Sequence, residues 1–258
     1  MTATIRSITP SRGTDAAEWE ARVQLAAAFR IANRLGWNEG IANHFSMVIP
    51  GQPDRFLLNP RELHFREITA SNLMIVDGDG NKLSGEGQVR AVAFNLHGRL
   101  HRAVPHAKCI LHAHPAYATA ISCVKGGRLG SARGIGMMLA NLTCYDDDMN
   151  GPIDEDEAAR LIRLVGQDKQ VVFHSMHGLS TLAESVAEAY DLFYFTERMA
   201  MYTVLARQMG QPLHELPPTP QRDALLVPLP QQGVRQAGPD QNLQRRLQVD
   251  EPALVPWI

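Results

Sequence analysis

The spacing of apolar residues along the chain predicts most of its helices. A helix is expected from about 15 to 35, because Thr14 or Asp15 can cap it and apolar residues recur on one face as far as Ile31. The segment 87–103 carries an apolar stripe at i, i+3, i+4, i+7 and i+11 and is expected to be a second helix. Three more are expected at 116–123, 154–165 and 184–208.

Short apolar runs between these helices predict strands. They fall within 40–50 and at 56–58, 73–77, 108–114 and 171–173, with 82–83 closing a hairpin on the turn at 77–81. The glycine-rich stretch 126–136 is expected to be a flexible loop. Irregular alternation of strands and helices, without a glycine-rich phosphate loop, indicates an α/β protein that has no Rossmann unit.

The two ends of the chain differ from its middle. Residues 1–14 form a polar leader without a regular pattern. The last segment, 211–258, holds nine of the sixteen prolines and shows no helical or strand period. We expect an extended tail that wraps a surface, such as that of a neighbouring subunit, or disorder over part of it. A single domain is therefore expected over 15–210.

Composition restricts the classes of protein that fit. The 258 residues, 45% of them hydrophobic, can bury a core without disulfides. A net charge of −2 gives no basic surplus for nucleic acid, and no apolar run is long enough to span a membrane. The chain has three cysteines and no Cys-x-x-Cys pair. Its N-terminal residues are polar and lack the apolar core of a signal peptide. A reducing, cytoplasmic location is the simplest interpretation.

The main chemical signal is a pair of histidines at the end of a predicted strand. His112 and His114 are two residues apart, so both side chains point to the same side. His177 follows the strand at 171–173, precedes Gly178, and is the candidate third ligand for a metal ion. Three imidazoles leave a coordination position open, which is typical of catalytic sites. A His-x-His pair alone is a weak signal, and polar packing is the alternative.

Other histidines have less specific interpretations. His97 and His101 are spaced i, i+4 on a helix face that Arg90 shares. We favour a polar helix face along a site wall or a subunit boundary over metal ligation. His174, three residues before His177, is a substitute ligand. The remaining candidates are treated as surface or loop residues: His64, His106 and His214.

Three blocks of sequence resemble the class II aldolase/adducin family. The first block comprises residues 42–46, 67–71 and 76–80. The second is 105–120 and contains His-x-His-Pro-x-Tyr-Ala-Thr-Ala at 112–120. The third comprises 177–179, 188–189 and 197–198. Together they cover about 15–210. The resemblance implies a three-layer α/β/α fold with a largely antiparallel central sheet, and a homotetramer with sites near subunit boundaries. It also implies a divalent ion, often zinc or manganese, on His112, His114 and His177.

The chain departs from the sugar-phosphate aldolases of that family. Counting back without a gap places their acid/base glutamate at Ala93, and the Gly-Asn pair of their phosphate pocket at Asn43-His44. Their Thr-Gly pair falls near Arg61-Glu62. A phosphorylated sugar is therefore not the expected substrate. Family branches without the glutamate include decarboxylases, iron-dependent oxygenases and the non-catalytic adducin heads.

These observations favour a divalent-metal-dependent carbon–carbon lyase, either a decarboxylase or a retro-aldolase. Its substrate would be a non-phosphorylated oxo- or hydroxy-carboxylate, and the ion would stabilise the enolate. Candidate proton-transfer residues are His44, Glu67, Glu86 and Tyr117. Candidate substrate-binding residues are Asn43, Arg61, Arg90 and His97, the arginines through two-pronged hydrogen bonds to a carboxylate.

Alternatives remain open at this point. A surface salt bridge is the alternative role for both Arg61 and Arg90, and we favour it for Arg61. The same three histidines would also suit an Fe(II)-dependent non-heme oxygenase, and an adducin-like interaction protein without turnover is a further possibility. No nucleic-acid or membrane partner is expected.

Overall fold

The computed structural model describes residues 15–130, 135–148 and 154–214. Its centre is an eight-stranded sheet of order β4-β3-β2-β1-β5-β8-β7-β6. Neighbouring strands are antiparallel except β6 and β7, which are parallel. The expected largely antiparallel sheet is thereby confirmed. The strands are β1 (His44–Ile49), β2 (Gln52–Leu58), β3 (Met74–Asp77), β4 (Lys82–Ser84), β5 (Cys109–Ala113), β6 (Thr143–Asp146), β7 (Val171–His174) and β8 (Gly178–Ala183).

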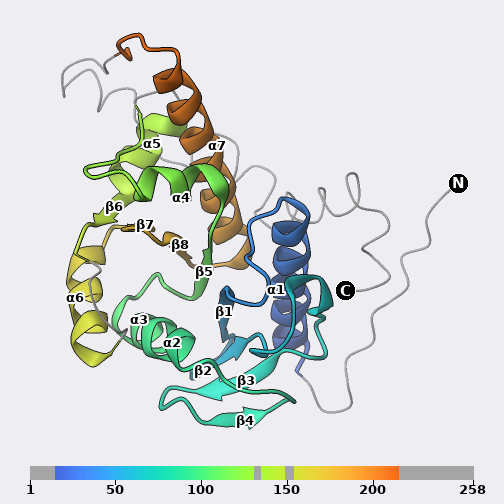
Figure 1. Ribbon diagram of the computed structural model, residues 1–258. Helices are drawn as coiled ribbons and strands as arrows, with labels where there is room; N and C mark the ends of the chain where they lie inside the picture. The colour runs from blue at the N-terminus through green and yellow to red at the C-terminus, as the bar shows by residue number, and fades with distance from the viewer. Residues whose placement is uncertain (1–14, 131–134, 149–153, 215–258) are drawn as a thin grey trace, which may run out of the picture.

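Helices cover both faces of the sheet and make three layers (Figure 1). One face carries α1 (Ala16–Arg34), the 3₁₀ turn η1 (Phe65–Glu67), α4 (Ala116–Ser122), α5 (Ile135–Leu142) and α7 (Val186–Gln208). The other carries α2 (Ala91–Ala93), the π-helical segment η2 (Phe94–Gly98), α3 (Arg99–Ala103) and α6 (Glu155–Val165).

The alternation of side chains along β5 assigns its histidine to one face. Leu111 is buried in the large core beneath α1 and α7, while Ile110 is buried in the smaller core beneath α3 and α6. Because successive side chains of a strand point to opposite faces, His112 lies on the same face as Ile110. The imidazole of His112 therefore lies on the side of the sheet that η2 and α3 cover.

Local capping explains why the predicted helices begin where they do. The side chain of Asp15 accepts a hydrogen bond from the backbone N–H of Ala17 and caps α1. Asp154 and Ser185 cap α6 and α7 in the same way. Such caps satisfy backbone donors that a helix cannot pair internally. The helices predicted at 15–35, 154–165 and 184–208 are confirmed.

Several elements differ from the sequence-based expectation. The helix predicted to start at residue 87 begins at Ala91 and contains a π-helical segment. Helix α5 starts at Ile135, within the stretch predicted to be a flexible loop. Strands β6 and β8 were not predicted. Strand β6 (Thr-Cys-Tyr-Asp) has no run of strongly apolar residues, and β8 (Gly-Leu-Ser-Thr-Leu-Ala) mixes polar with apolar positions although all six are buried. The predicted leader, and the predicted tail beyond 214, lie outside the described residues.

All three cysteines are free: Cys109, Cys123 and Cys144. In the described ranges, no helix has the length and apolar character that crossing a bilayer requires.

Candidate metal centre

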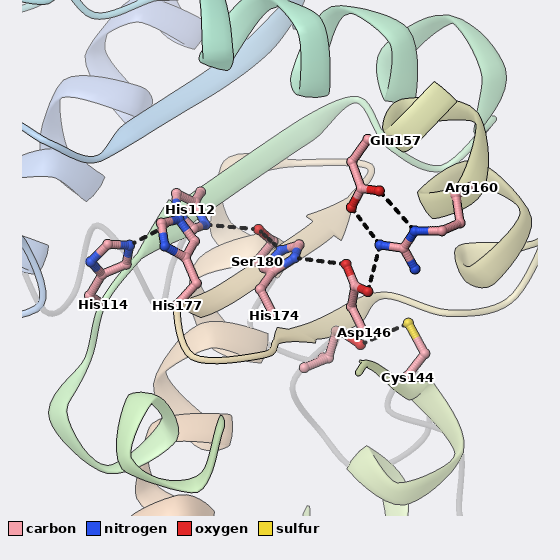
Figure 2. A network of polar contacts seen from close by, with 10 residues as sticks. His112, His114, Cys144, Asp146, Glu157, Arg160, His174, His177 and Ser180 are labelled. Atoms are coloured by element: carbon pink, nitrogen blue, oxygen red, sulfur yellow. Dashed lines mark hydrogen bonds and ion pairs between the residues drawn. The ribbon is translucent and has the colours of Figure 1, made fainter. Parts of the chain in front are cut away.

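Three imidazoles converge at one end of the sheet. His112 lies on β5, His114 follows that strand directly, and His177 lies in the loop between β7 and β8. One ring nitrogen of each lies within 4.8 Å of the others. The Nε2 atoms of His114 and His177 are 3.4 Å apart, and the His112 and His177 rings stack with centroids 5.0 Å apart (Figure 2). The convergence predicted from the sequence is present.

Strand β8, rather than β7, brings the third imidazole to the first two. Ala113 of β5 pairs with Leu179 of β8, so the residues just before Leu179 lie beside His114. A Cβ atom on Gly178 would lie 2.5 Å from Cδ2 of His114 and 2.7 Å from the carbonyl oxygen of Ala113. Only glycine allows so close an approach between the strand and the ring.

The loop that carries His177 has an unusual backbone. Met176 adopts a left-handed conformation with φ of 53° although it is not glycine. Its backbone N–H donates to the carbonyl oxygen of Ser122 at the end of α4, and the backbone N–H of His177 donates to the carbonyl oxygen of His174. These two bonds fix a short turn that a non-glycine residue enters only at an energetic cost.

The proton on His114 can be located from its partner. Nδ1 of His114 lies 2.8 Å from a carboxylate oxygen of Glu39, and the backbone N–H of His114 donates to the carbonyl oxygen of Trp37. An ionised carboxylate only accepts hydrogen bonds, so Nδ1 carries the hydrogen. In the tautomer with its hydrogen on Nδ1, Nε2 is an unprotonated lone pair on the side of His177.

The proton on His112 follows from a second set of contacts, shown in Figure 2. Nδ1 of His112 lies 3.1 Å from Oγ of Ser180, which lies 2.8 Å from Nε2 of His174. Nδ1 of His174 in turn forms a 3.6 Å contact with Asp146. In the tautomer of His174 that donates from Nδ1 toward Asp146, Nε2 accepts from the Ser180 hydroxyl, and the Ser180 oxygen then accepts from Nδ1–H of His112. Nε2 of His112 is therefore also bare.

An ion pair anchors the far end of these contacts. Arg160 donates to Asp146 over 2.6 Å and also to Glu157. Burial opposes ionisation of Asp146, but hydrogen bonds from His174 and Arg160 outweigh it and hold the pKa of this carboxyl below its usual range. Asp146 is therefore an anionic acceptor behind the histidines.

The three ligand candidates suit a divalent ion. Burial lowers the pKa of His112 well below its usual value, and burial, followed by the proximity of the His114 and His174 rings, lowers the pKa of His177 to about 4. These two rings are neutral near pH 7, the form that binds metals. Neutral imidazoles whose Nδ1–H groups are held by a carboxylate or hydroxyl, with Nε2 free, are the usual donor set for zinc and related ions.

Other predicted residues lie next to this cluster. His44 pairs with His112 across β1 and β5, and the two ring centroids are 5.0 Å apart. Burial, and after it the positive charge of Arg90, lowers the pKa of His44 to about 3. The pKa of Arg90 is lowered by burial and then by Arg61. The backbone N–H of Arg61 donates to the carbonyl oxygen of Gln88, two residues before Arg90, and Arg90 donates to the carbonyl oxygen of Ile41, three residues before His44.

Asn43 has a side chain with one free donor. Its Oδ1 accepts a hydrogen bond from the backbone N–H of Glu39 over 2.7 Å. Its Nδ2 is buried and has no hydrogen-bond partner in the part of the chain that the structure describes. A buried donor without an acceptor costs about 1–3 kcal/mol, so a ligand oxygen at this point would be stabilising.

Four predicted residues lie apart from the triad or behind it. Glu67 is exposed and caps the 3₁₀ turn through the backbone N–H of His64, and Glu86 is exposed in the loop after β4. Tyr117 is half-buried at the start of α4 and packs against the large core. His97 is fully buried against His44. Their predicted chemical roles stay predictions.

Position 93 belongs to an apolar core. Ala93 is fully buried in a cluster with Phe56, Leu58, Met74 and Val76. The position to which the gapless count assigned the family's glutamate therefore holds no acid and lies in apolar surroundings.

The histidines that remain have local structural roles. His174 is not among the three converging ligands and instead contacts Ser180 and Asp146. His106 bonds the carbonyl oxygen of Lys169, and His214 is exposed. His97 and His101, for which the sequence left open a site wall or a subunit boundary, are both buried within the chain.

Sequence reasoning missed the groups that orient the rings. Ser46 follows His44 by two residues and therefore shares its face, a signal that could have been used. Glu39, Asp146 and Ser180 are distant in sequence from the histidines they serve, and no local pattern connects them.

Comparison with known proteins agrees with this geometry. A model of the Class II Aldolase and Adducin N-terminal domain matches residues 23–204. A Pseudomonas aeruginosa protein provisionally named an aldolase class 2 protein is 34% identical over 203 residues, which are 78% of this chain and 77% of that protein. An adducin-related protein of Schizosaccharomyces pombe is 38% identical over 185 residues, which are 69% of this chain and 56% of the relative.

Two solved structures extend the comparison to the fold. An aldolase II superfamily protein from Pseudomonas syringae aligns with a TM-score of 0.78 and 29% identity, over 90% of this chain and 95% of that one. L-fuculose 1-phosphate aldolase from Glaciozyma antarctica aligns with a TM-score of 0.78 and 25% identity, over 94% and 96%. This chain belongs to the class II aldolase/adducin family.

Proposed function

We propose that the protein is a divalent-metal-dependent carbon–carbon lyase that acts on a non-phosphorylated oxo- or hydroxy-carboxylate. The observation that carries the proposal is the convergence of His112, His114 and His177, whose ligand nitrogens lie within 4.8 Å of one another. Two of these rings have Nδ1 committed to Glu39 or Ser180 and Nε2 free. Such an arrangement positions ligands for an ion and leaves a coordination site for substrate.

The chemistry requires a sink for an electron pair. When a carbon–carbon bond next to a carbonyl breaks, an ion held by neutral imidazoles would supply positive charge for the resulting oxyanion. Loss of carbon dioxide needs this sink but no base in its first step. Position 93, where the family's sugar-phosphate aldolases have their acid/base glutamate, holds an alanine in apolar surroundings, and a first step without a base is compatible with this.

Substrate recognition would use the charged and amide groups beside the triad. Arg90, held by a 2.7 Å hydrogen bond to the carbonyl oxygen of Ile41, would bind a carboxylate together with Arg61. The free Nδ2 donor of Asn43 would bind a second oxygen of the substrate. The chain has His44 where the family's sugar-phosphate aldolases have part of a phosphate pocket, which supports a carboxylate over a phosphate.

Metal analysis tests the ligand assignment. Purified wild-type protein is expected to hold about one divalent ion per chain, measured by plasma mass spectrometry, or to bind Zn²⁺ or Mn²⁺ after chelator treatment. His112→Ala and His114→Ala should lose this binding and stay folded by circular dichroism. His214→Ala, which removes an exposed histidine, is the matched control and should bind as wild type. Unchanged binding in the two ligand variants would refute the site.

A substrate screen tests the reaction. A panel of oxo- and hydroxy-carboxylates, followed by NMR, should reveal carbon dioxide or an aldehyde as a product. Oxygen consumption with ferrous iron would instead identify the oxygenase alternative. Folded protein that binds no ion would favour an interaction protein, for which the 38% identity to an adducin-related protein is the supporting observation.

A further inference from the structure

A second row of buried polar groups lies on the other side of His112. Nδ1 of His44 lies 3.1 Å from Nε2 of His97, and Nδ1 of His97 lies 2.7 Å from Oγ of Ser46. The same hydroxyl lies 2.7 Å from Nε2 of His101. We call His44, His97, Ser46 and His101 the His44 chain. All four are buried, and the chain joins β1 to η2 and α3.

The last contact of the His44 chain fixes the direction of every hydrogen bond. Nδ1 of His101 bonds the backbone carbonyl oxygen of Ala107. A carbonyl oxygen only accepts, so Nδ1 of neutral His101 carries the hydrogen and Nε2 is an acceptor. Ser46 has one hydrogen and must donate it to Nε2 of His101. The Ser46 oxygen can then only accept, so His97 donates to it from Nδ1.

The same logic reaches the site. With its hydrogen on Nδ1, neutral His97 has a bare Nε2, which accepts from Nδ1–H of His44. His44 therefore has its own hydrogen on Nδ1 and a bare Nε2. All three rings are buried, and within the described part of the chain their hydrogen bonds go to imidazole nitrogens, the Ser46 hydroxyl and a backbone carbonyl, an environment that favours the neutral form.

We propose that the His44 chain holds His44 in its Nδ1–H tautomer, so that His44 presents a bare Nε2 next to the three metal ligands and accepts a hydrogen bond there from a hydroxyl group. His97, Ser46 and His101 are positioning residues in this arrangement. His44 is the acceptor that touches the hydroxyl. The contacts of Ser180 and Asp146 likewise hold the hydrogen of His112 on Nδ1. His44 and His112 therefore both have a bare Nε2.

This assignment narrows the substrate class and rests on the proposed function. A bare nitrogen cannot donate a hydrogen bond to a keto oxygen, but it pairs with an O–H group. Arg90 donates to the carbonyl oxygen of Ile41, three residues before His44, so the group that fits is a hydroxy-carboxylate whose hydroxyl faces His44. An oxo-carboxylate would leave the bare Nε2 without a donor. A hydroxyl next to an acceptor is the feature that a retro-aldol cleavage uses and a simple decarboxylation does not.

Nitrogen NMR tests the tautomer without relying on metal or activity. In metal-free protein labelled with ¹⁵N-histidine, two-bond and three-bond couplings distinguish a protonated from a bare nitrogen. Signals of His44 are assigned by their loss in His44→Gln. We expect Nδ1 protonated and Nε2 bare for His44, His97 and His101 at pH 7.5. Protonation of Nε2 in wild-type His44 would overturn the proposal.

Ser46→Ala tests whether the chain imposes the tautomer. Without the hydroxyl, Nδ1–H of His97 loses its acceptor, and His97 should move its hydrogen to Nε2 and donate to Nδ1 of His44. His44 is then expected to show a protonated Nε2. Ser84→Ala, on exposed strand β4 at the sheet edge, is the matched control and should leave the pattern unchanged. If His44 keeps its bare Nε2 in Ser46→Ala, the positioning role is wrong.

A pair of small anions tests recognition of the hydroxyl. Glycolate and methoxyacetate share a carboxylate and an α-oxygen, but only glycolate carries an O–H. Calorimetry on Zn²⁺-loaded protein gives the ratio of the dissociation constants of methoxyacetate and glycolate. We expect this ratio to be at least about tenfold larger in wild type than in Ser46→Ala or His44→Phe, because methoxyacetate leaves the buried acceptor of wild type unpaired. Equal preferences in wild type and both variants would overturn the acceptor role.

The outcomes separate this inference from the proposed function. Protein that binds no Zn²⁺ but shows bare Nε2 on His44 would refute the lyase and keep the tautomer assignment. Protein that binds Zn²⁺ but has Nε2 of His44 protonated would keep the metal centre and refute the inference. A wild-type preference for glycolate that both variants retain would show that water or the ion, rather than His44, accepts the hydroxyl.

Discussion

Acidification is expected to destabilise the metal-free protein through its buried histidines. A histidine in an unfolded chain titrates near pH 6.5, whereas burial lowers the pKa of His44 to about 3 and of His101 to about 4. These groups bind protons only after unfolding, so the unfolded state holds more protons below pH 6.5. The free energy of unfolding is therefore greatest above that pH and falls as the pH drops toward the folded-state pKa values.

The size of the effect follows from the same numbers. At pH 5.5 an unfolded histidine is about nine-tenths protonated, while the two buried ones stay almost wholly neutral. Integrated from pH 7.5 to pH 5.5, each histidine lowers the free energy of unfolding by about 1.3 kcal/mol, or about 2.6 kcal/mol for the pair. His97 and His112 shift in the same direction and add to this. Against a typical total of about 5–15 kcal/mol, the loss is readily measurable.

Urea unfolding of chelator-treated protein at pH 7.5 and 5.5, followed by circular dichroism, measures the difference. Ordinary carboxyl groups titrate near pH 4 and contribute little in this window. His101→Phe removes one buried titrating ring and should reduce the pH-dependent loss by about 1.3 kcal/mol. His214→Ala, at an exposed position, should reduce it much less. Equal free energies of unfolding at the two pH values in wild type would refute the reasoning, because neutral buried histidines require a difference.

Three further predictions concern single residues. Gly178→Ala should lower stability by about 1–3 kcal/mol and weaken Zn²⁺ binding measured by chelator competition, because the new Cβ would lie 2.5 Å from the His114 ring. Glu39→Gln should weaken Zn²⁺ binding about tenfold by removing the charged acceptor of the His114 Nδ1–H. Ala93→Glu should lower the free energy of unfolding, measured in urea, by several kcal/mol without raising turnover, since it buries a carboxyl among apolar side chains.

Each of these has a contrary result. Wild-type Zn²⁺ affinity in Gly178→Ala would mean that β8 moves away from His114 without affecting the centre. An unchanged affinity in Glu39→Gln would mean that the ring needs no charged partner. A large gain of turnover in Ala93→Glu would mean that an acid at this position reaches the substrate, and that the aldolase comparison was interpreted wrongly.

Sequence patterns predicted the helices and strands that are determined by residues close to them in the chain. Helices α1, α6 and α7 have a capping side chain within one turn of their start, and that signal is visible in the sequence. Strand β8 has no such signal: its serine and threonine are buried because Ser180 bonds two histidines and Thr181 donates to the carbonyl oxygen of Ala189. Polar residues that find partners across the fold do not look like core positions in the sequence.

The candidate site divides in the same way. The period of two along a strand determined that His112 and His114 face one side, and the sequence blocks determined the family. Only the tertiary structure decided that β8 inserts between β5 and β7, which brings His177 to the pair across 63 residues of chain. It also decided which nitrogen of each ring is bare, because the acceptors that hold the protons come from distant segments. The sequence therefore specifies which side chains are available, and packing specifies where their lone pairs point.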